Sequence, residues 1–173
     1  MGIVILFLRG INVSGQKKIK MADLRHALIK GGFKDVQTYI QSGNIILTSE
    51  NEAVGHSVGQ IIKKNFDFEV PVLSLTVAEI KHILNNIPFQ QFDEKNLYFT
   101  LLFESPGQDL VDAFNKLEFQ NEDFVVTSNC VYLNCKKGAG KAKLNNNLIE
   151  KKLHIIATTR NLNTMRKMLE MAS

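Results

Sequence analysis

Glycines and lysines mark the segment GINVSGQKKIK, residues 10–20, near the start of the chain. It follows an apolar run and precedes a helical pattern, as does the phosphate-binding loop of a nucleotide triphosphatase. That loop has lysine directly after its second glycine, whereas here Gln16 follows Gly15 and precedes Lys17 and Lys18. The spacing argues against a triphosphatase. It still favours an anion, because free N–H groups near a helix start attract negative charge.

A second basic segment, KKGAGKAK at residues 136–143, lies between a predicted strand and a predicted helix. Lysines and flexible glycines in such a loop can wrap a phosphate. The third glycine of a dinucleotide fingerprint is missing, which argues against that motif. A solvated turn is the alternative. We expect an anion site here, with Lys141 and Lys143 as ligands.

Polar residues also stand at the ends of predicted strands. They are Arg9, Asn12, Gln41, Asn44, Arg160 and Asn161. A rigid sheet can present such side chains to a ligand, although Asn and Gln in turns commonly bond to nearby backbone. We expect the loop after the first strand and the turn at 41–44 to lie at opposite ends of one sheet. These residues then share a site only if the two halves of the chain are suitably arranged.

Signatures of catalysis and of metal binding are absent from the sequence. Ser14 lacks the flanking glycines of a nucleophile elbow, and no CxxC or HExxH spacing occurs. The histidines lie on predicted helices without a recognisable carboxylate partner, and we expect them on the surface; they are His26, His56, His82 and His154. We expect no metal and no cofactor.

The cysteines indicate a reducing compartment. Cys130 and Cys135 lie in one predicted strand on opposite faces, roughly 16 Å apart. A disulfide needs Cα atoms within about 7 Å, so we expect two free thiols. The apolar run at residues 3–8 is too short for a signal peptide, and no apolar window is long enough to span a membrane. We expect a soluble, cytoplasmic protein.

Charge is sorted along the chain beyond its formal total of +4. Residues 9–34 hold seven Lys or Arg against one acid, and residues 136–152 hold six lysines against one acid. Residues 79–123 hold nine acids against three bases. A basic surface beside an acidic one suggests an anionic ligand, and solvated helix faces are the alternative.

Hydrophobic spacing predicts the order β-α-β-β-α-β over residues 1–75. The predicted strands are 3–8, 36–41, 44–48 and 70–75, and the predicted helices are 21–31 and 52–66. Gly31 and Gly32 supply a helix stop, and Ser42-Gly43 supplies a hairpin turn. This order is that of the ferredoxin-like unit.

The same order follows in residues 76–173. Thr76 and Glu79 form a capping box at the start of a connecting helix that buries Ile80, Ile83, Leu84 and Ile87. The predicted strands are 97–103, 124–127, 131–135 and 155–159, and the predicted helices begin near 106, 145 and 162. We therefore expect an α+β fold of two tandem ferredoxin-like (α/β-plait) units, with domains at 1–75 and 76–173.

The first strand of each half is apolar at odd and even positions, in IVILFL and LYFTLLF. Strands of this kind are buried on both faces. The helices of a ferredoxin-like unit cover only one face. We expect the second face to be covered by the other half or by a second copy of the chain.

Four segments together resemble an uncharacterised bacterial family, the domain of unknown function 1697 proteins. They are LFLRGINVSGQKKIKM, TYIQSGNIILTS, KKGAGKAKL and ATTRNLNTM. The resemblance implies two α/β-plait domains and no established activity. Leu162 stands where the family commonly has tryptophan, and Ala142 where it commonly has serine.

Three functions remain open. The leading hypothesis is a protein that binds a phosphate-bearing ligand, nucleotide or nucleic acid, through its basic loops. RNA recognition has little support, because only Tyr98, Phe99 and Phe103 offer stacking faces. The second hypothesis is a small enzyme that holds an anionic substrate between its halves. The third is an interaction protein that forms a homodimer through its apolar sheet face.

Overall fold

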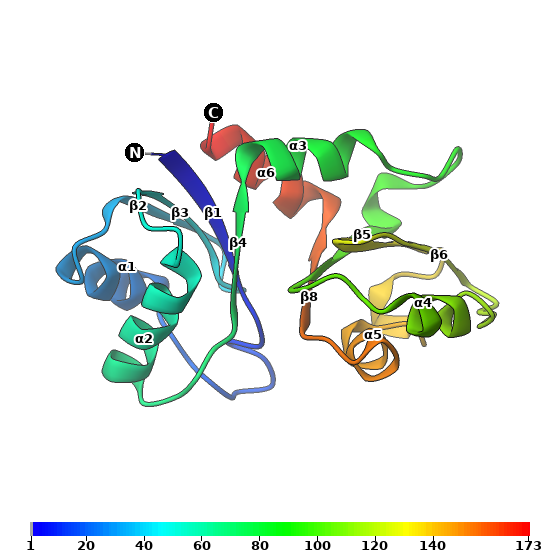
Figure 1. Ribbon diagram of the computed structural model, residues 1–173, viewed down its shortest axis with the longest axis horizontal. Coiled ribbons are helices and arrows are strands. Elements are labelled where there is room, and N and C mark those ends of the chain that lie inside the picture. The colour runs from blue at the N-terminus through cyan, green and yellow to red at the C-terminus, as the bar shows by residue number, and fades with distance from the viewer. Residues whose placement is uncertain (1) are drawn as a thin grey trace. The chain divides into compact units, whose positions relative to one another are not determined.

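The computed structural model describes residues 2–173 and contains, in that range, two four-stranded antiparallel sheets and six α-helices (Figure 1). The chain divides into two compact units. The first unit extends to His82 and also includes Lys167–Ser173, and the second unit is Ile83–Arg166. The mixed α+β class expected from the sequence is confirmed.

The first unit holds the sheet with order β2-β3-β1-β4, in which every neighbouring pair is antiparallel. Its elements in chain order are β1 (Gly2–Leu8), α1 (Met21–Lys30), β2 (Lys34–Tyr39), β3 (Asn44–Ser49), α2 (Val54–Phe66) and β4 (Val72–Thr76). The central strands β1 and β3 are rich in isoleucine, leucine and valine, which suit a sheet buried on both faces.

Helices α1 and α2 pack on one face of this sheet (Figure 1). The predicted stripe of α1 is confirmed, because Met21, Leu24 and Leu28 are all buried in the core beneath the helices. Alternate residues of β1, Leu6 and Leu8, complete that core from the sheet side.

The predicted glycine stop of α1 is also confirmed. Gly32 has a φ of 96°, and its N–H donates to Ile29 O at 3.0 Å. The N–H of Phe33 donates to Leu28 O at 3.1 Å. This pair of bonds satisfies two carbonyls at the helix end, and it requires the left-handed backbone that glycine adopts without strain.

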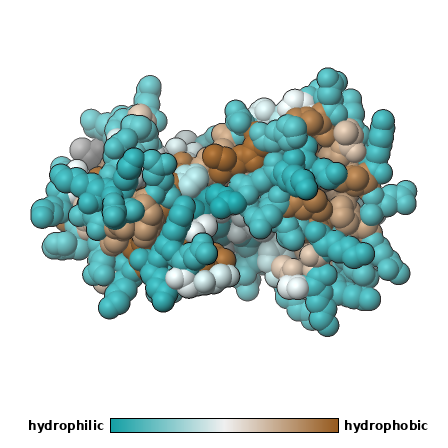
Figure 2. Space-filling model, turned by 90° about the horizontal axis from the view of Figure 1, so that it is seen from below, coloured by the Kyte–Doolittle hydropathy of each residue, from teal (hydrophilic) through white to brown (hydrophobic). Residues whose placement is uncertain are grey.

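The second face of the first sheet is buried as well. Ile5 and Phe7 are fully buried on it, and Ile46 is 3% exposed. These side chains are covered within a single chain, so their burial does not require a second copy. The face of the molecule shown in Figure 2 is mostly hydrophilic, with apolar side chains confined to limited areas.

The second unit repeats the arrangement with the order β6-β7-β5-β8, again antiparallel throughout. Its elements in chain order are β5 (Leu97–Leu102), α4 (Gln108–Phe114), β6 (Glu122–Val126), β7 (Cys130–Cys135), α5 (Asn146–Leu153) and β8 (Ala157–Asn161), with short 3-10 turns at Glu94–Asn96 and Ala139–Lys141. Cys130 and Cys135 are free and buried. Cys135 packs with Leu133 and Phe114 in the core of this unit.

Hydrogen bonds repeat between the units although their sequences do not. At the end of β1, Leu8 N–H donates to Gly43 O at 2.8 Å, and at the end of β5, Leu102 N–H donates to Asn129 O at 2.9 Å. The next residue in each unit also donates to a matching position, from Arg9 to Pro71 O and from Phe103 to Ile156 O, both at 3.0 Å. The duplication therefore extends to individual backbone contacts.

Two further helices are α3 (Val77–Asn85) and α6 (Leu162–Met171). The boundary between the two units lies within each of them, after His82 in α3 and after Arg166 in α6. The predicted capping box of α3 is confirmed, since Thr76 N–H donates to Glu79 Oε2 at 2.7 Å and Glu79 N–H donates to Thr76 Oγ1 at 3.2 Å. Asn161 starts α6 by accepting the Thr164 N–H at 2.9 Å.

Some element bounds differ from the prediction. Ile87 lies beyond α3, because the residue before a proline avoids the helical region and Pro88 follows it. Leu117 lies beyond α4, where the N–H of Lys116 and that of Leu117 bond three residues back and tighten the last turn. No helix in residues 2–173 combines the length and apolar character that crossing a bilayer requires.

Candidate functional site

The loop 9–20 and the hairpin turn 40–43 lie together at one end of the first sheet. β1 pairs antiparallel with β3, and Phe7 is opposite Asn44. The end of β1 therefore lies beside the start of β3, where the turn is. The expectation that this loop and turn lie at opposite ends of the sheet was wrong. The helix α1 returns the chain so that β2 runs in the same direction as β1, and both strands end at the same edge.

Gly43 allows the turn to approach the loop closely. Its φ is 84°, and a Cβ at this position would lie 2.6 Å from Leu8 Cβ and 2.8 Å from Ile11 Cδ1. Neither the backbone conformation nor the space admits a larger residue without displacement. Gly43, the glycine of the predicted hairpin turn, thus also allows the turn to pack closely against the loop beside the site.

Asn12 fastens the loop to the turn. Its Nδ2 donates to Gln41 O at 2.7 Å and to Ile19 O at 3.0 Å, and its Oδ1 accepts the Ile19 N–H at 2.9 Å. Its φ of 54° is in the left-handed region that asparagine tolerates. These bonds use the hydrogen-bonding groups of the side chain, so Asn12 shapes the site.

Lys17 ties the other side of the loop to the segment before β4. Its Nζ donates to Glu69 O at 2.7 Å, and its φ is 44°. The Lys63 ammonium, bonded to Glu69 Oε1 at 2.7 Å, lowers the pKa of that carboxyl, and Lys17 adds to the effect. Lys17 therefore supports the loop and contributes positive charge beside it.

A pocket of about 610 Å³ opens between this loop, the turn and the helix ends. It is lined by Asn12, Gly15, Lys18, Ile19, Lys20, Asp23, Gln41 and Phe66. Three predicted site residues, Asn12, Lys18 and Gln41, meet here. Small-molecule sites typically have volumes of about 300–1,000 Å³. The pocket is thus large enough for a ligand of nucleotide size.

The start of α1 adds to the positive character of this pocket. Lys20 is the N-cap residue, and no side chain caps the helix. The first turn of a helix presents unsatisfied N–H groups and the positive end of the helix dipole. Lys18 and Lys20 are exposed beside it, and Asp23 is an acidic group of the same lining.

Lys20 belongs to the basic segment that the sequence marks as favourable for an anion, although it was not among the predicted ligands, and neither Asp23 nor Phe66 was predicted. Lys20 and Asp23 lie three residues apart at the start of α1. This spacing places them on the same side of the helix start, and it could have been recognised in the sequence. Phe66 lies at the far end of α2, and nothing in its local pattern distinguishes it from a core residue. Only the fold brings it to the pocket.

Like Lys17, two further predicted residues near this pocket do not line it. Asn44 is fully buried, and its Nδ2 donates to Tyr39 O and to Ser42 Oγ, both at 2.9 Å. It closes the hairpin. Arg9 follows β1 directly, and its backbone N–H holds the start of β4 through Pro71 O.

In the second unit, Lys141 and Lys143 lie in a loop in which the N–H groups of residues 141–144 are already bonded. Glu122 is 6% exposed, and its Oε1 accepts the N–H groups of Lys143 and Leu144. A carboxylate of the chain itself occupies the position that a bound anion would need at these N–H groups. The lysine side chains remain exposed around it.

The polar residues at the end of β8 form hydrogen bonds with residues close to them in the sequence. Arg160 is 7% exposed and donates to Thr158 Oγ1 at 2.7 Å and to Thr159 O at 2.9 Å. Burial lowers the pKa of its guanidinium to about 10. Asn161 caps α6. Both follow the alternative of local backbone bonding.

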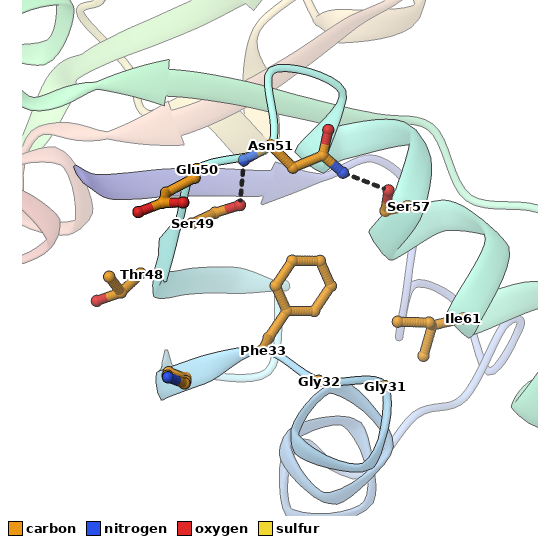
Figure 3. A pocket seen from close by; sticks show the side chains of 10 residues that line it. Gly31, Gly32, Phe33, Thr48, Ser49, Glu50, Asn51, Ser57 and Ile61 are labelled. Carbon is orange, nitrogen blue, oxygen red and sulfur yellow. Dashed lines mark hydrogen bonds between the residues drawn. The ribbon is translucent and has the colours of Figure 1, made fainter. Parts of the chain in front are cut away.

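A second pocket, of about 350 Å³, lies at the other end of the first sheet, between the end of α1 and the start of α2 (Figure 3). Its polar groups bond to one another: Asn51 N–H donates to Ser49 Oγ at 3.0 Å, and Asn51 Nδ2 donates to Ser57 Oγ at 2.9 Å. The ring of Phe33 stands among them (Figure 3). None of the predicted site residues lines this pocket.

The titratable side chains of the described residues do not form a metal site. Within the described chain, no group of His, Cys, Asp and Glu side chains is arranged to hold a metal ion. The predicted surface position of His26, His56, His82 and His154 is confirmed, since all four are exposed. The prediction that His154 lies on a helix was wrong, because this residue is the C-cap that follows α5 and its φ is 55°.

Comparison with known proteins gives a family and a fold. The model of a family described as "Protein of unknown function (DUF1697)" matches residues 1–132. No curated protein matches the chain. A solved structure, that of the conserved bacterial protein SP0830 from Streptococcus pneumoniae, is similar with a TM-score of 0.74 at 24% identity, over 99% of this chain and 98% of that chain. At this identity the likeness shows the fold alone.

The family match covers the residues that form the larger pocket. The segments LFLRGINVSGQKKIKM and TYIQSGNIILTS, which contain the loop and the turn, both lie within residues 1–132. The segments KKGAGKAKL and ATTRNLNTM lie beyond them. Since the match spans most of the sequence, the chain belongs to the DUF1697 family of proteins of unknown function.

Proposed function

We propose that this protein binds a phosphate-bearing small molecule in the pocket formed by the loop 9–20 and the turn 40–43. The observation that carries the proposal is that Lys18 and Lys20 line a pocket of about 610 Å³ at the start of α1, a helix without a side-chain cap. Lysine ammonium groups and free N–H groups at a helix start are both favourable partners for phosphate.

A small ligand is favoured over a nucleic acid. Recognition of RNA on a sheet uses exposed aromatic side chains on central strands. Phe99 of β5 is fully buried and packs edge-on against Tyr132, with ring centroids 5.7 Å apart. Tyr98 packs against the core of the second unit. These two rings do not offer a stacking surface, whereas the pocket offers a concave site of about 610 Å³ lined by lysines.

The enzyme hypothesis has less support. It requires the six strand-end residues to converge on one pocket, and only Asn12 and Gln41 line the larger pocket. The amide of Asn161, another of the six, caps α6. We therefore propose binding and no reaction.

The test is a titration with ribose 5-phosphate followed by NMR of the backbone amides. We expect shifts at residues 18–23, and we expect Lys18→Gln with Lys20→Gln to weaken binding at least tenfold because two cationic contacts are lost. The matched control is Lys30→Gln with Lys64→Gln, which removes the same charge from α1 and α2 outside the pocket lining. Equal affinity in both double variants would overturn the proposal.

We propose further that each unit is ferredoxin-like, that the chain divides into domains at 1–75 and 76–173, and that the protein works in a bacterial cytoplasm. The β-α-β-β-α-β order and the antiparallel 2-3-1-4 arrangement of both sheets support the first point. Two buried free cysteines support a reducing compartment.

A further inference from the structure

The larger pocket joins a cationic part to an aromatic part. Lys18 and Lys20 supply the charge, whereas Phe66, at the end of α2, supplies an aromatic side chain that is only half-buried. Phe66 packs on the core of the first unit, and its ring centroid lies 6.4 Å from that of Phe68. A half-buried ring that lines the pocket leaves part of its apolar surface available to a ligand.

The lining also contains one acidic side chain, which can accept hydrogen bonds. Asp23 is exposed in the first turn of α1, and within the described residues it forms no ion pair with the lysines of the pocket. A carboxylate accepts hydrogen bonds from hydroxyl groups and repels phosphate. The part of a ligand beside Asp23 should therefore carry hydroxyls.

We infer that the pocket takes a nucleoside monophosphate, with the phosphate at Lys18 and Lys20, ribose hydroxyls at Asp23 and the base on Phe66. This inference rests on the proposed function and adds the base and the sugar to it. Stacking of a base on an aromatic side chain tolerates any base, since each has a π face. The inference accordingly names the class of nucleotide and leaves the base open.

Charge favours one phosphate over three. The lining contains two lysines and one aspartate, which leaves a net positive charge of one. This positive charge is far smaller in magnitude than the negative charge of a triphosphate. Lys17 stands beside the pocket, with its ammonium on Glu69 O. A single phosphate group matches this balance.

The experiment compares adenosine 5′-monophosphate, ribose 5-phosphate and adenosine on the full chain by calorimetry. We expect the monophosphate to bind at least tenfold more tightly than ribose 5-phosphate, about 1.4 kcal/mol, and adenosine to bind more weakly than the monophosphate. Equal affinity for the monophosphate and ribose 5-phosphate overturns the inference and leaves the proposed function intact. Failure of both phosphates to bind removes the proposed function itself.

A variant separates stacking from general stability. Phe66→Leu should reduce the affinity for the monophosphate to that for ribose 5-phosphate and leave the latter unchanged. Phe33→Leu is the matched control, because Phe33 packs on the same core but lines the smaller pocket at the other end of the sheet. An equal loss in both variants, or no loss in Phe66→Leu, contradicts the role of Phe66. The comparison of ligands on the unmodified chain needs no variant and stands if either one fails to fold.

Discussion

The two units place their long basic loops at opposite ends of the same strand arrangement. In the first unit the basic loop is 9–20, after β1, and the segment after β3 is the short acidic stretch ENEA, residues 50–53. In the second unit the segment after β5 is the short stretch FESPG, residues 103–107, and the basic loop is 136–145, after β7. Because β1 and β3 are antiparallel, as are β5 and β7, these loops lie at opposite sheet ends.

The residues that hold the two basic loops also differ. Asn12, an uncharged amide, fastens the loop of the first unit, and the positive charge of Lys18 and Lys20 remains uncompensated by it. Glu122, a carboxylate, fastens the loop of the second unit from within. A duplicated scaffold has thus kept its backbone contacts, while an uncharged amide holds the basic loop in one copy and a carboxylate holds it in the other. This difference is why we place the ligand in the first unit.

Gly43 and Asn129 occupy equivalent turn positions, and exchanging each for alanine tests whether the crowding at Gly43 is particular to the first unit. Gly43→Ala adds a Cβ that would lie 2.6 Å from Leu8 Cβ at a φ of 84°. We expect it to lower the free energy of unfolding by about 3 kcal/mol, from strain and overpacking. Asn129→Ala should cost about 1 kcal/mol or less, since it removes only a side-chain bond to Thr127 Oγ1. Urea unfolding followed by circular dichroism measures both, and similar losses would refute the crowding at Gly43.

Asn12→Ala tests whether the loop of the first unit depends on one side chain. The change removes bonds to Ile19 and to Gln41, and we expect a loss of about 2 kcal/mol in the free energy of unfolding. Gln41→Ala is the control, because Gln41 contributes its backbone carbonyl and keeps it. Thermal unfolding of both variants would show the difference. A loss in Gln41→Ala as large as that in Asn12→Ala would contradict this account.

The elements of the fold could be predicted from the sequence because their signals are local. The stripe of α1, its glycine stop and the Thr76–Glu79 capping box depend on residues within about two helical turns of each other. The end of the sheet at which the turn 40–43 lies depends on strand direction. That direction follows from the connection through α1, which makes β2 run parallel to β1.

The site was predicted only in part, for a related reason. Asn12, Lys18 and Gln41 were chosen as polar residues at strand ends or in a basic loop, and all three line the pocket. The same rule also selected Asn44 and Asn161, whose amides bond to local groups. Polarity at a strand end does not distinguish a ligand from a cap. Phe66 was missed because an aromatic side chain in a helical stripe is most often core.

Glu122→Gln tests whether the Glu122 carboxylate holds the basic loop of the second unit in place. The neutral amide accepts weaker bonds from the N–H groups of Lys143 and Leu144, and we expect a loss of about 1.5 kcal/mol. Glu118→Gln, at an exposed position, should change stability by less than about 0.5 kcal/mol. Hydrogen exchange should show faster exchange in residues 138–145 of the first variant only. Unchanged protection there would mean that the loop is held by other contacts.

Both thiols lie in the second unit, so their ionisation at alkaline pH should weaken that unit. Burial raises the pKa of Cys130 well above its ordinary value of 9.0 and raises the pKa of Cys135 to about 11. In the unfolded chain the thiols ionise near pH 9, whereas in the folded chain they stay protonated. The unfolded state therefore binds fewer protons, so stability is complete below pH 9 and falls as the pH rises toward 11.

At pH 9.5 we expect a loss on the order of 1 kcal/mol relative to pH 8. The measurement is urea unfolding at the two pH values, with labelling of the thiols by a maleimide as a second probe that reports only on the second unit. The double variant Cys130→Ala with Cys135→Ala should lose this pH dependence and keep the ligand affinity of the first unit. If the thiol-free variant shows the same loss, the alkaline effect arises outside the cysteines, and the thiols are not the feature that distinguishes the two units.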